Sequence, residues 1–233
     1  MKEIKPMHIA KALNPERGVT AIIGGGGKTT LIEVLANELK KNGRVLITTS
    51  THIKKPPFET LIDPFEADII AAFKLNSILA IGRSEGEKLI SSSLPFEKLA
   101  HLCDYVLVEA DGSRGLPVKA PNDKEPVIPN NAKLVIAVIG LDAIGERIEN
   151  AAHRPEIYAD ILGVKTNEII TPEFAARVLI NERGQKKNIN FKRFAAVLNK
   201  ADDSERITRA YQVKSYIKDD AFIVSLINSP FVI

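Results

Sequence analysis

The feature that most constrains this chain is a short apolar run that ends in four glycines, a lysine and two threonines, TAIIGGGGKTT at residues 20–30. Glycine lets the backbone turn with φ > 0 and brings several N–H groups close to one anion. A helical pattern over residues 28–41 follows directly, and its positive N-terminal end would lie at the same place. A strand, a glycine loop and a helix in this order are typical of a phosphate-binding loop.

The individual positions of this loop have expected roles. Lys28 can reach the terminal phosphates of a nucleotide, and the Thr29 hydroxyl can ligate Mg²⁺. The remaining phosphate-binding positions are expected to be Gly24, Gly25, Gly26, Gly27 and Thr30. Because Ile22 stands where the usual pattern has its first glycine, the match is to a shortened form, G-x-x-G-K-T-T, that begins at Gly24. The alternative is a glycine-rich turn that binds nothing.

Length and composition predict one domain spanning residues 1–233, with enough apolar residues for a substantial core. The net charge of +3 is too small to favour nucleic acid or a membrane surface as partner. No apolar run approaches the ~18 residues that a membrane span needs, and the N-terminus lacks the apolar segment of a signal peptide. We therefore expect a cytoplasmic protein.

Apolar, β-branched runs alternate with helical patterns along the chain. This order predicts an α/β fold like that of P-loop NTPases, with three layers: a mostly parallel central sheet and helices on both faces. Strands are expected at 19–23, 44–48, 77–81, 105–109, 134–139, 194–198 and 221–224, and helices at 29–41, 67–75, 85–91, 154–162, 172–179 and 203–217. Residues 54–76 are a less regular insertion and 112–131 a long loop, and loops of this length are often functional.

Two carboxylates follow the expected strand at 105–109. Glu109 and Asp111 are two residues apart, so both could face the phosphates if the strand extends that far. Mg²⁺ is held by carboxylates, water and phosphate oxygens. One carboxylate could hold the metal while the other orients an attacking water, which makes both candidates for catalysis together with Lys28. A solvated acidic pair is the alternative.

The strand at 194–198 leads into Asn199-Lys200-Ala201-Asp202, the N-K-x-D pattern of guanine-reading loops. The Asp202 carboxylate would accept from guanine N1–H and the exocyclic amine, Asn199 would contact O6 and N7, and the Lys200 stem would pack on the base. Adenine lacks this pair of donors. Asp202 and Asp203 could instead only cap the next helix, so the nucleotide is expected to be GTP or ATP.

Hydroxyl groups and a histidine follow the second expected strand, in the string TTSTH at residues 48–52. If this strand lies beside the phosphate loop, these groups could ligate Mg²⁺ or bind the γ-phosphate. Ser50 and His52 are therefore candidates for contact with a second substrate. A polar turn without function is the alternative.

Taken together, these segments resemble the YqeC-like family of accessory proteins for selenium-dependent molybdenum hydroxylases. The matching strings are IIGGGGKTT, TTSTHI, LVEADGSRGLPVKAPNDKEPVIP, VIGLDAIGERI and AHRPE, which span most of the chain. The resemblance implies a P-loop fold and a role in maturing such a hydroxylase, with the hydroxylase or a protein that handles its molybdenum cofactor as partner. Polar residues within the matching strings, which could form a second-substrate or cofactor surface or a salt-bridged loop, are Arg114, Lys119, Glu125, His153 and Arg154.

A looser resemblance is to the ATP-dependent Mur and folylpolyglutamate ligases, whose shortened loop and Thr-Ser-x-His turn look like GGGGKTT and residues 49–52 here. Those ligases are longer and add a C-terminal domain. The sequence thus predicts Mg²⁺-dependent binding and hydrolysis of a purine nucleoside triphosphate by an accessory protein. A phosphotransferase or ligase acting on a small acceptor, and a non-catalytic carrier of a nucleotide-linked molybdenum cofactor, are the alternatives.

Overall fold

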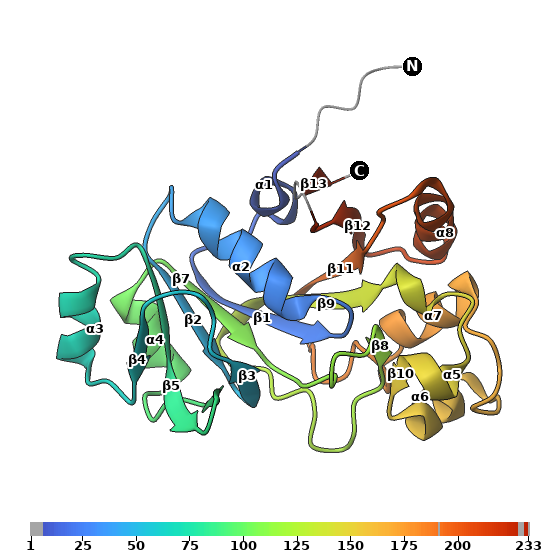
Figure 1. Ribbon diagram of the computed structural model, residues 1–233, viewed down its shortest axis with the longest axis horizontal. Helices are drawn as coiled ribbons and strands as arrows, with labels where there is room; N and C mark the ends of the chain where they lie inside the picture. Colours follow the sequence, from blue (N-terminus) through green and yellow to red (C-terminus); the bar gives the residue numbers. More distant parts are fainter. Residues whose placement is uncertain (1–6, 191, 228–230, 233) are drawn as a thin grey trace.

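A mostly parallel sheet crosses the molecule, and helices cover both of its faces (Figure 1). The computed structural model describes residues 7–190, 192–227 and 231–232. The strands are β1 (Gly18–Gly24), β2 (Val45–Thr49), β3 (His52–Lys54), β4 (Thr60–Ile62), β5 (Ile78–Glu85), β6 (Lys88–Ile90), β7 (Tyr105–Glu109), β8 (Val118–Lys119), β9 (Ala132–Gly140), β10 (Ala152–His153), β11 (Arg193–Asn199), β12 (Asp220–Ser225) and β13 (Phe231–Val232). The helices are α1 (Ile9–Leu13), α2 (Lys28–Leu39), α3 (Glu66–Ala72), α4 (Phe96–Leu102), the 3₁₀ turn η1 (Leu141–Ala143), α5 (Ile148–Ala151), α6 (Pro155–Leu162), α7 (Pro172–Ile180) and α8 (Ser204–Ser215).

The strand order places β1 in the middle of the sheet. The order is β13-β12-β11-β9-β1-β7-β2-β5-β6-β3, and β4 pairs with the other edge of β5. The strands from β12 to β5 pair in parallel, whereas β13, β6 and β3 add antiparallel edges. The carboxyl ends of the parallel strands therefore meet along one edge, where ligands bind in open α/β sheets.

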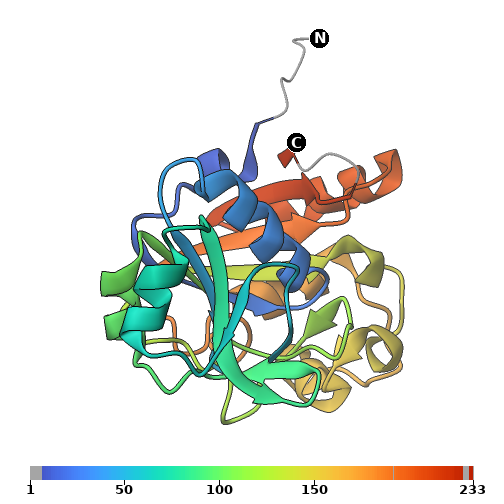
Figure 2. The same ribbon diagram turned by 60° about the vertical axis from the view of Figure 1, so that its left-hand side comes forward.

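Two apolar cores, one on each face, hold the layers together. Along β1, Ile22 joins the core beneath α1 and α2, while Ala21 and Ile23 join the core beneath α3 to α8. This alternation follows from the two-residue period of a strand, and burying each large aliphatic side chain stabilises the fold by about 1.5–3 kcal/mol. Figure 2 shows α2 running across its face of the sheet near α1.

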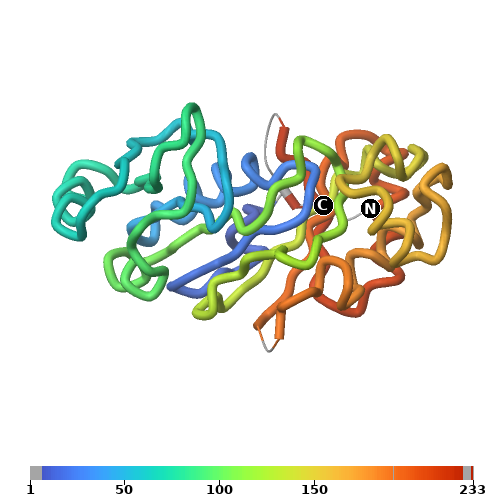
Figure 3. The backbone as a smooth tube through the Cα atoms, turned by 90° about the horizontal axis from the view of Figure 1, so that it is seen from below, coloured from blue at the N-terminus to red at the C-terminus, as the bar shows by residue number. Residues whose placement is uncertain are grey.

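Two peripheral regions extend the molecule beyond the sheet. The segment with β4 and α3 lies at one end, and α5, α6 and α7 lie at the other (Figures 1 and 3). Between the second region and the main sheet, β8 and β10 form a separate parallel pair that aligns Lys119 with His153. No helix in the described part of the chain is long and apolar enough to cross a membrane.

The predicted α/β fold with a mostly parallel sheet is confirmed, but the helix expected at 85–91 is wrong. Residues there form the hairpin of β5 and β6, in which Glu85 pairs with Lys88. The two residues between them include Gly86, whose φ is +61°. A two-residue hairpin turn needs a positive φ at its first position, which glycine supplies without steric cost.

Candidate functional site

The glycine loop joins the end of β1 to the start of α2 in a conformation that excludes side chains. Gly24, Gly26 and Gly27 have φ values of +96°, +71° and +127°. A β-carbon on Gly26 would lie 2.2 Å from the backbone nitrogen of Gly140, so even a methyl group has no room. Gly24, Gly26 and Gly27 are therefore needed for backbone torsion, and Gly24 and Gly26 also for close packing against β9.

The loop is tied to its neighbours through several of its own N–H groups. Gly25 donates to the Val138 carbonyl at 2.8 Å and Gly26 to the Leu116 carbonyl at 3.1 Å. Gly27, the N-cap residue of α2, has no side chain with which to accept a hydrogen bond from the first helical turn. The N–H groups of the first helical turn therefore face the loop opening, where an anion is favoured by both hydrogen bonding and the helix dipole.

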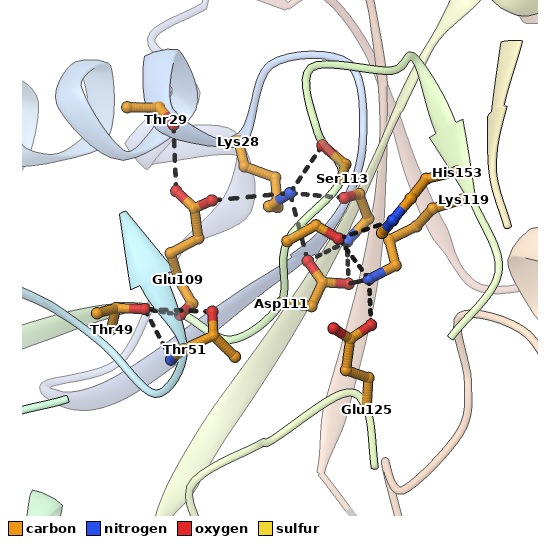
Figure 4. Close-up of polar contacts among 12 residues, drawn as sticks. Lys28, Thr29, Thr49, Thr51, Glu109, Asp111, Ser113, Lys119, Glu125 and His153 are labelled. Carbon is orange, nitrogen blue, oxygen red and sulfur yellow. Dashed lines mark hydrogen bonds and ion pairs between the residues drawn. The ribbon is translucent and has the colours of Figure 1, made fainter. Parts of the chain in front are cut away.

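Lys28 is folded back beneath the loop and is only 3% exposed. Its Nζ donates to the Gly24 carbonyl at 2.7 Å and lies 3.3 Å from Ser113 Oγ. Nζ is also 3.3 Å from Asp111 Oδ1 and 3.8 Å from Glu109 Oε1 (Figure 4). Two carboxylates, one at the end of β7 and one just after it, thus neutralise the lysine of the glycine loop.

Asp111 links the loop to a second buried lysine. Both of its carboxylate oxygens accept from the Gly24 N–H, at 3.1 and 3.0 Å. Oδ2 lies 3.0 Å from the Nζ of Lys119, whose side chain is 0% exposed. Asp111 is therefore shared between Lys28 on one side and Lys119 on the other.

Glu109 faces a hydroxyl group at the mouth of the loop. Its Oε2 accepts from the Thr29 hydroxyl at 3.1 Å, and its main-chain carbonyl accepts from the Thr49 hydroxyl at 2.8 Å. Burial raises the pKa of Glu109, and the Lys28 ammonium acts in the opposite direction. A carboxylate and a hydroxyl at this position are hard oxygen donors of the kind that Mg²⁺ prefers.

The hydroxyl-rich turn lies one strand further from the loop than the sequence suggested. β2 pairs with β7, so β7 separates it from β1. Ser50 Oγ donates to the Val127 carbonyl at 2.7 Å. His52 is exposed, and its Nε2 lies 3.0 Å from Glu85 Oε2 on the β5–β6 hairpin. The structure brings Thr49 to Glu109, but it does not bring Ser50 or His52 into contact with Lys28.

The segment after Asp111 carries an ionic cluster around the buried Lys119, in which Glu125 and Arg154 are partly buried. Lys119 Nζ donates to the Gly112 carbonyl at 2.7 Å and to Glu125 Oε2 at 2.6 Å. The same Glu125 oxygen accepts from Arg154 Nη1 at 2.6 Å. Burial alone would raise the pKa of Glu125, but the hydrogen bonds from Arg154 and Lys119 outweigh it and lower the pKa. The cluster joins residues from the long loop to the start of α6.

The N-K-x-D residues lie at the end of β11, two strands from β1. Asn199 Nδ2 donates to the Gly26 carbonyl at 2.7 Å, so this motif touches the glycine loop directly. Lys200 has a left-handed backbone with φ +68°, and its Nζ donates to Asp142 Oδ2 at 2.5 Å. The Asn199 Oδ1 atom is buried without a hydrogen-bond partner among the described residues.

The two aspartates of the motif make different hydrogen bonds, although both form an ion pair with Arg206. Asp203 caps α8 by accepting from the Arg206 N–H at 2.8 Å. Asp202 Oδ1 instead accepts from the hydroxyl of Ser225, the last residue of β12, at 2.6 Å. Helix capping therefore accounts for Asp203, whereas Ser225 and Arg206 hold the Asp202 carboxylate in place.

Several residues of the site were given no role in the sequence analysis. Ser113 contacts Lys28 and Asp142 pairs with Lys200, although neither belongs to a motif with an assigned role. Gln185 is buried and donates to the Lys119 carbonyl at 2.7 Å, from a polar segment after α7. Such partners become visible only when the long-range contacts are known.

The sequence of this chain matches a known protein family. A family model described as YqeC protein matches residues 20–156 of this chain. The "Uncharacterized protein YqeC" of Escherichia coli (strain K12) is 32% identical over 188 residues, which cover 73% of this chain and 71% of that protein. Among solved structures, the apo form of a GTPase from Pyrococcus abyssi is loosely similar, with a TM-score of 0.40 and 14% identity over 90% of each chain.

Proposed function

The chain belongs to the YqeC protein family, and we propose that it binds a purine nucleoside triphosphate with Mg²⁺ and hydrolyses it slowly. The position of Lys28 carries this proposal. A lysine that is 3% exposed, at the first turn of an uncapped helix and beside a four-glycine loop, has the setting of a phosphate-binding lysine. On binding, its Nζ would exchange Asp111 for phosphate oxygens and stabilise charge on the transferring phosphoryl group.

The residues around Thr29 fit a magnesium ion that arrives with the nucleotide. Thr29 Oγ1 and Glu109 Oε2 lie 3.1 Å apart, and Asp111 is the next carboxylate along the chain. No group of three or more His, Cys, Asp or Glu side chains among the described residues could hold a metal. Mg²⁺ often uses only one or two protein carboxylates and completes its shell with phosphate and water. When bound, the ion supplies positive charge against the phosphates.

The base is proposed to be guanine. Asn199 is held against the glycine loop and Asp202 is oriented by Ser225, whereas capping is left to Asp203. A carboxylate in the base-binding position accepts two hydrogen bonds from guanine but faces no such donor pair on adenine. GTP is therefore the favoured ligand and ATP the competing one.

The biological role is proposed from the resemblance of the sequence motifs to those of the YqeC-like accessory proteins. Slow hydrolysis would switch an accessory protein between two states that differ in affinity for a molybdenum hydroxylase or a protein that handles its cofactor. The loop residue Ser113 supports such a switch, because its contact with Lys28 would be lost when that lysine turns to phosphate. A pull-down of the hydroxylase that differs between GDP and a non-hydrolysable GTP analogue tests this role, and equal recovery with both would refute it.

The first experiment is calorimetric titration of GTP and ATP in the presence and absence of Mg²⁺. We expect GTP to bind more tightly, and Lys28→Ala to abolish measurable binding of both nucleotides. Lys98→Ala is the matched control, because Lys98 is exposed and pairs with Glu66 on the opposite face from α2. Binding of neither nucleotide to the wild-type protein would refute the proposal. Preferential binding of ATP would refute the base assignment alone.

A further inference from the structure

The small sheet of β8 and β10 brings a histidine to the edge of the phosphate site. His153 pairs in register with Lys119, and its Nδ1 lies 3.2 Å from the Gly112 carbonyl. Gly112 stands between Asp111 and Ser113, which both contact Lys28 (Figure 4). His153 is 41 residues from Gly112 in the sequence, yet it contacts the segment after β7 whose carboxylates neutralise Lys28.

This contact fixes the tautomer of His153. A carbonyl oxygen can only accept a hydrogen bond, so Nδ1 carries the proton and Nε2 keeps its lone pair. Burial, followed by the nearby charges of Arg154 and Lys119, lowers the pKa of His153; Glu125 opposes this and Arg114 adds to it. The imidazole is therefore neutral near pH 7, which is the form that accepts a proton from a substrate.

Two arginines beside His153 adopt a conformation that is rare outside glycine. Arg114 and Arg154 have φ values of +53° and +65°. Such backbones are unfavourable for residues other than glycine and are maintained at functional sites by the surrounding structure. Arg154 is anchored by Glu125 and by the Ala120 carbonyl, while Arg114 is exposed. The four cations near Gly112 are Lys28, Arg114, Lys119 and Arg154, and they face three carboxylates, Glu109, Asp111 and Glu125.

We propose that Arg114, His153 and Arg154 form a second binding site, for a small acceptor that carries both an oxyanion and a hydroxyl group. The arginines hold the oxyanion, and Nε2 of His153 faces the hydroxyl. The reaction at this site rests on the proposed nucleotide binding, whereas binding of the anion does not. The hydroxyl oxygen bonds to the γ-phosphorus as its proton passes to Nε2. The bond from that phosphorus to the β–γ bridging oxygen breaks, and its electron pair leaves on the nucleoside diphosphate.

Inorganic phosphate serves as the probe for the oxyanion. It is titrated into protein saturated with Mg²⁺ and a non-hydrolysable GTP analogue, so that the glycine loop is already occupied. Histidine labelled with ¹⁵N reports the tautomer of His153 and its response to phosphate. We expect the Nδ1–H tautomer at pH 7.5, a resonance shift on titration, and about tenfold weaker phosphate binding in Arg114→Gln, as for loss of one charge-assisted hydrogen bond.

Arg83→Gln provides the matched control, because Arg83 is an exposed arginine on the distant β5–β6 hairpin and should leave phosphate affinity unchanged. A parallel titration with acetate distinguishes a carboxylate-bearing acceptor from a phosphate-bearing one. An Nε2–H tautomer, or phosphate and acetate binding that Arg114→Gln does not weaken, would overturn the inference. The same titrations in Lys28→Ala, which lacks the loop lysine, test the anion site even if wild-type protein binds no nucleotide.

Discussion

The candidate site has a phosphate side, formed around Lys28, Asp111 and Lys119, and a base side, formed around Lys200 and Asp142. On the phosphate side the charges are buried and neutralise one another, whereas on the base side they remain in contact with water. Lys28 and Lys119 are 3% and 0% exposed, and both lie against Asp111. Lys200 and Asp142 form an equally direct pair, but each is 30% exposed. The same chemical pairing thus occurs in two very different dielectric surroundings.

This difference determines how each side can respond to a ligand. A buried charge that loses its partner carries a large desolvation penalty, so the phosphate side must exchange one partner for another. With Lys119 in place, Lys28 can leave Asp111 for a phosphate without stranding the carboxylate. The base side is screened by water, and its residues can meet a ligand with little rearrangement.

The largest expected effect on stability comes from removing a charge of the buried cluster on the phosphate side. Lys119→Met keeps most of the side-chain volume but leaves Asp111 and Glu125 short of a cation, and should lower the free energy of unfolding by about 3–5 kcal/mol. Lys200→Met, at the half-exposed pair, should lower it by less than about 1 kcal/mol. Urea denaturation of both variants measures the contrast. Equal losses would show that burial does not distinguish the two sides.

Glu125→Gln should have a smaller effect on stability, and the effect should decrease as the pH is lowered. Because the pKa of Glu125 is lowered in the folded protein, its stabilising contribution is present above its unfolded pKa of about 4.3 and is lost as the pH falls through the folded value. At pH 7 the variant should be less stable by about 1.5–3 kcal/mol, since hydrogen bonds to two charged groups are weakened. Denaturation curves between pH 3 and 7 should converge on acidification, and a gap that widens at low pH would contradict this assignment.

On the base side, the effect should fall on affinity rather than on stability. Asp202→Ala should weaken GTP binding by roughly 10- to 100-fold through loss of charge-assisted hydrogen bonds, while ATP binding changes little. Calorimetry with both nucleotides measures this preference, and urea denaturation monitors the fold. An equal loss for GTP and ATP would show that Asp202 does not read the base.

The smallest effect separates the two neighbouring aspartates. Asp203→Ala removes the cap of α8 and should cost about 1 kcal/mol of stability, but it should leave the ratio of GTP to ATP affinity unchanged. The melting temperature and the same pair of titrations test this. A changed ratio would mean that capping and base reading share this side chain.

The main strands and the glycine loop could be predicted because their signals are local. β1 and α2 follow from an apolar run, four glycines and a helical period, and β7 was expected at its observed limits. Thr171 and Asp203 cap helices where the sequence indicated helix starts. In each of these cases a few consecutive residues specify the local conformation.

The remaining features depend on contacts between distant segments. β8 and β10 are two residues long and have no pattern of their own, so only their pairing reveals them. Nothing local indicates that β7 lies between β1 and β2, or that Lys119 is buried. The roles assigned to the site residues remain predictions, although the geometry now tells which of them can act together.

The hydrogen bond from Asn199 to Gly26 affects how the two fragments of a nucleotide, a nucleoside and an inorganic triphosphate, would bind separately. It connects the proposed base-reading loop to the glycine loop, so we expect a shift of one loop to displace the other. The free energy for binding a nucleoside should therefore depend on whether inorganic triphosphate is already bound, and by the same amount in the reverse case. Each fragment would raise or lower the affinity for the other, so the identity of the base would change the affinity for the triphosphate.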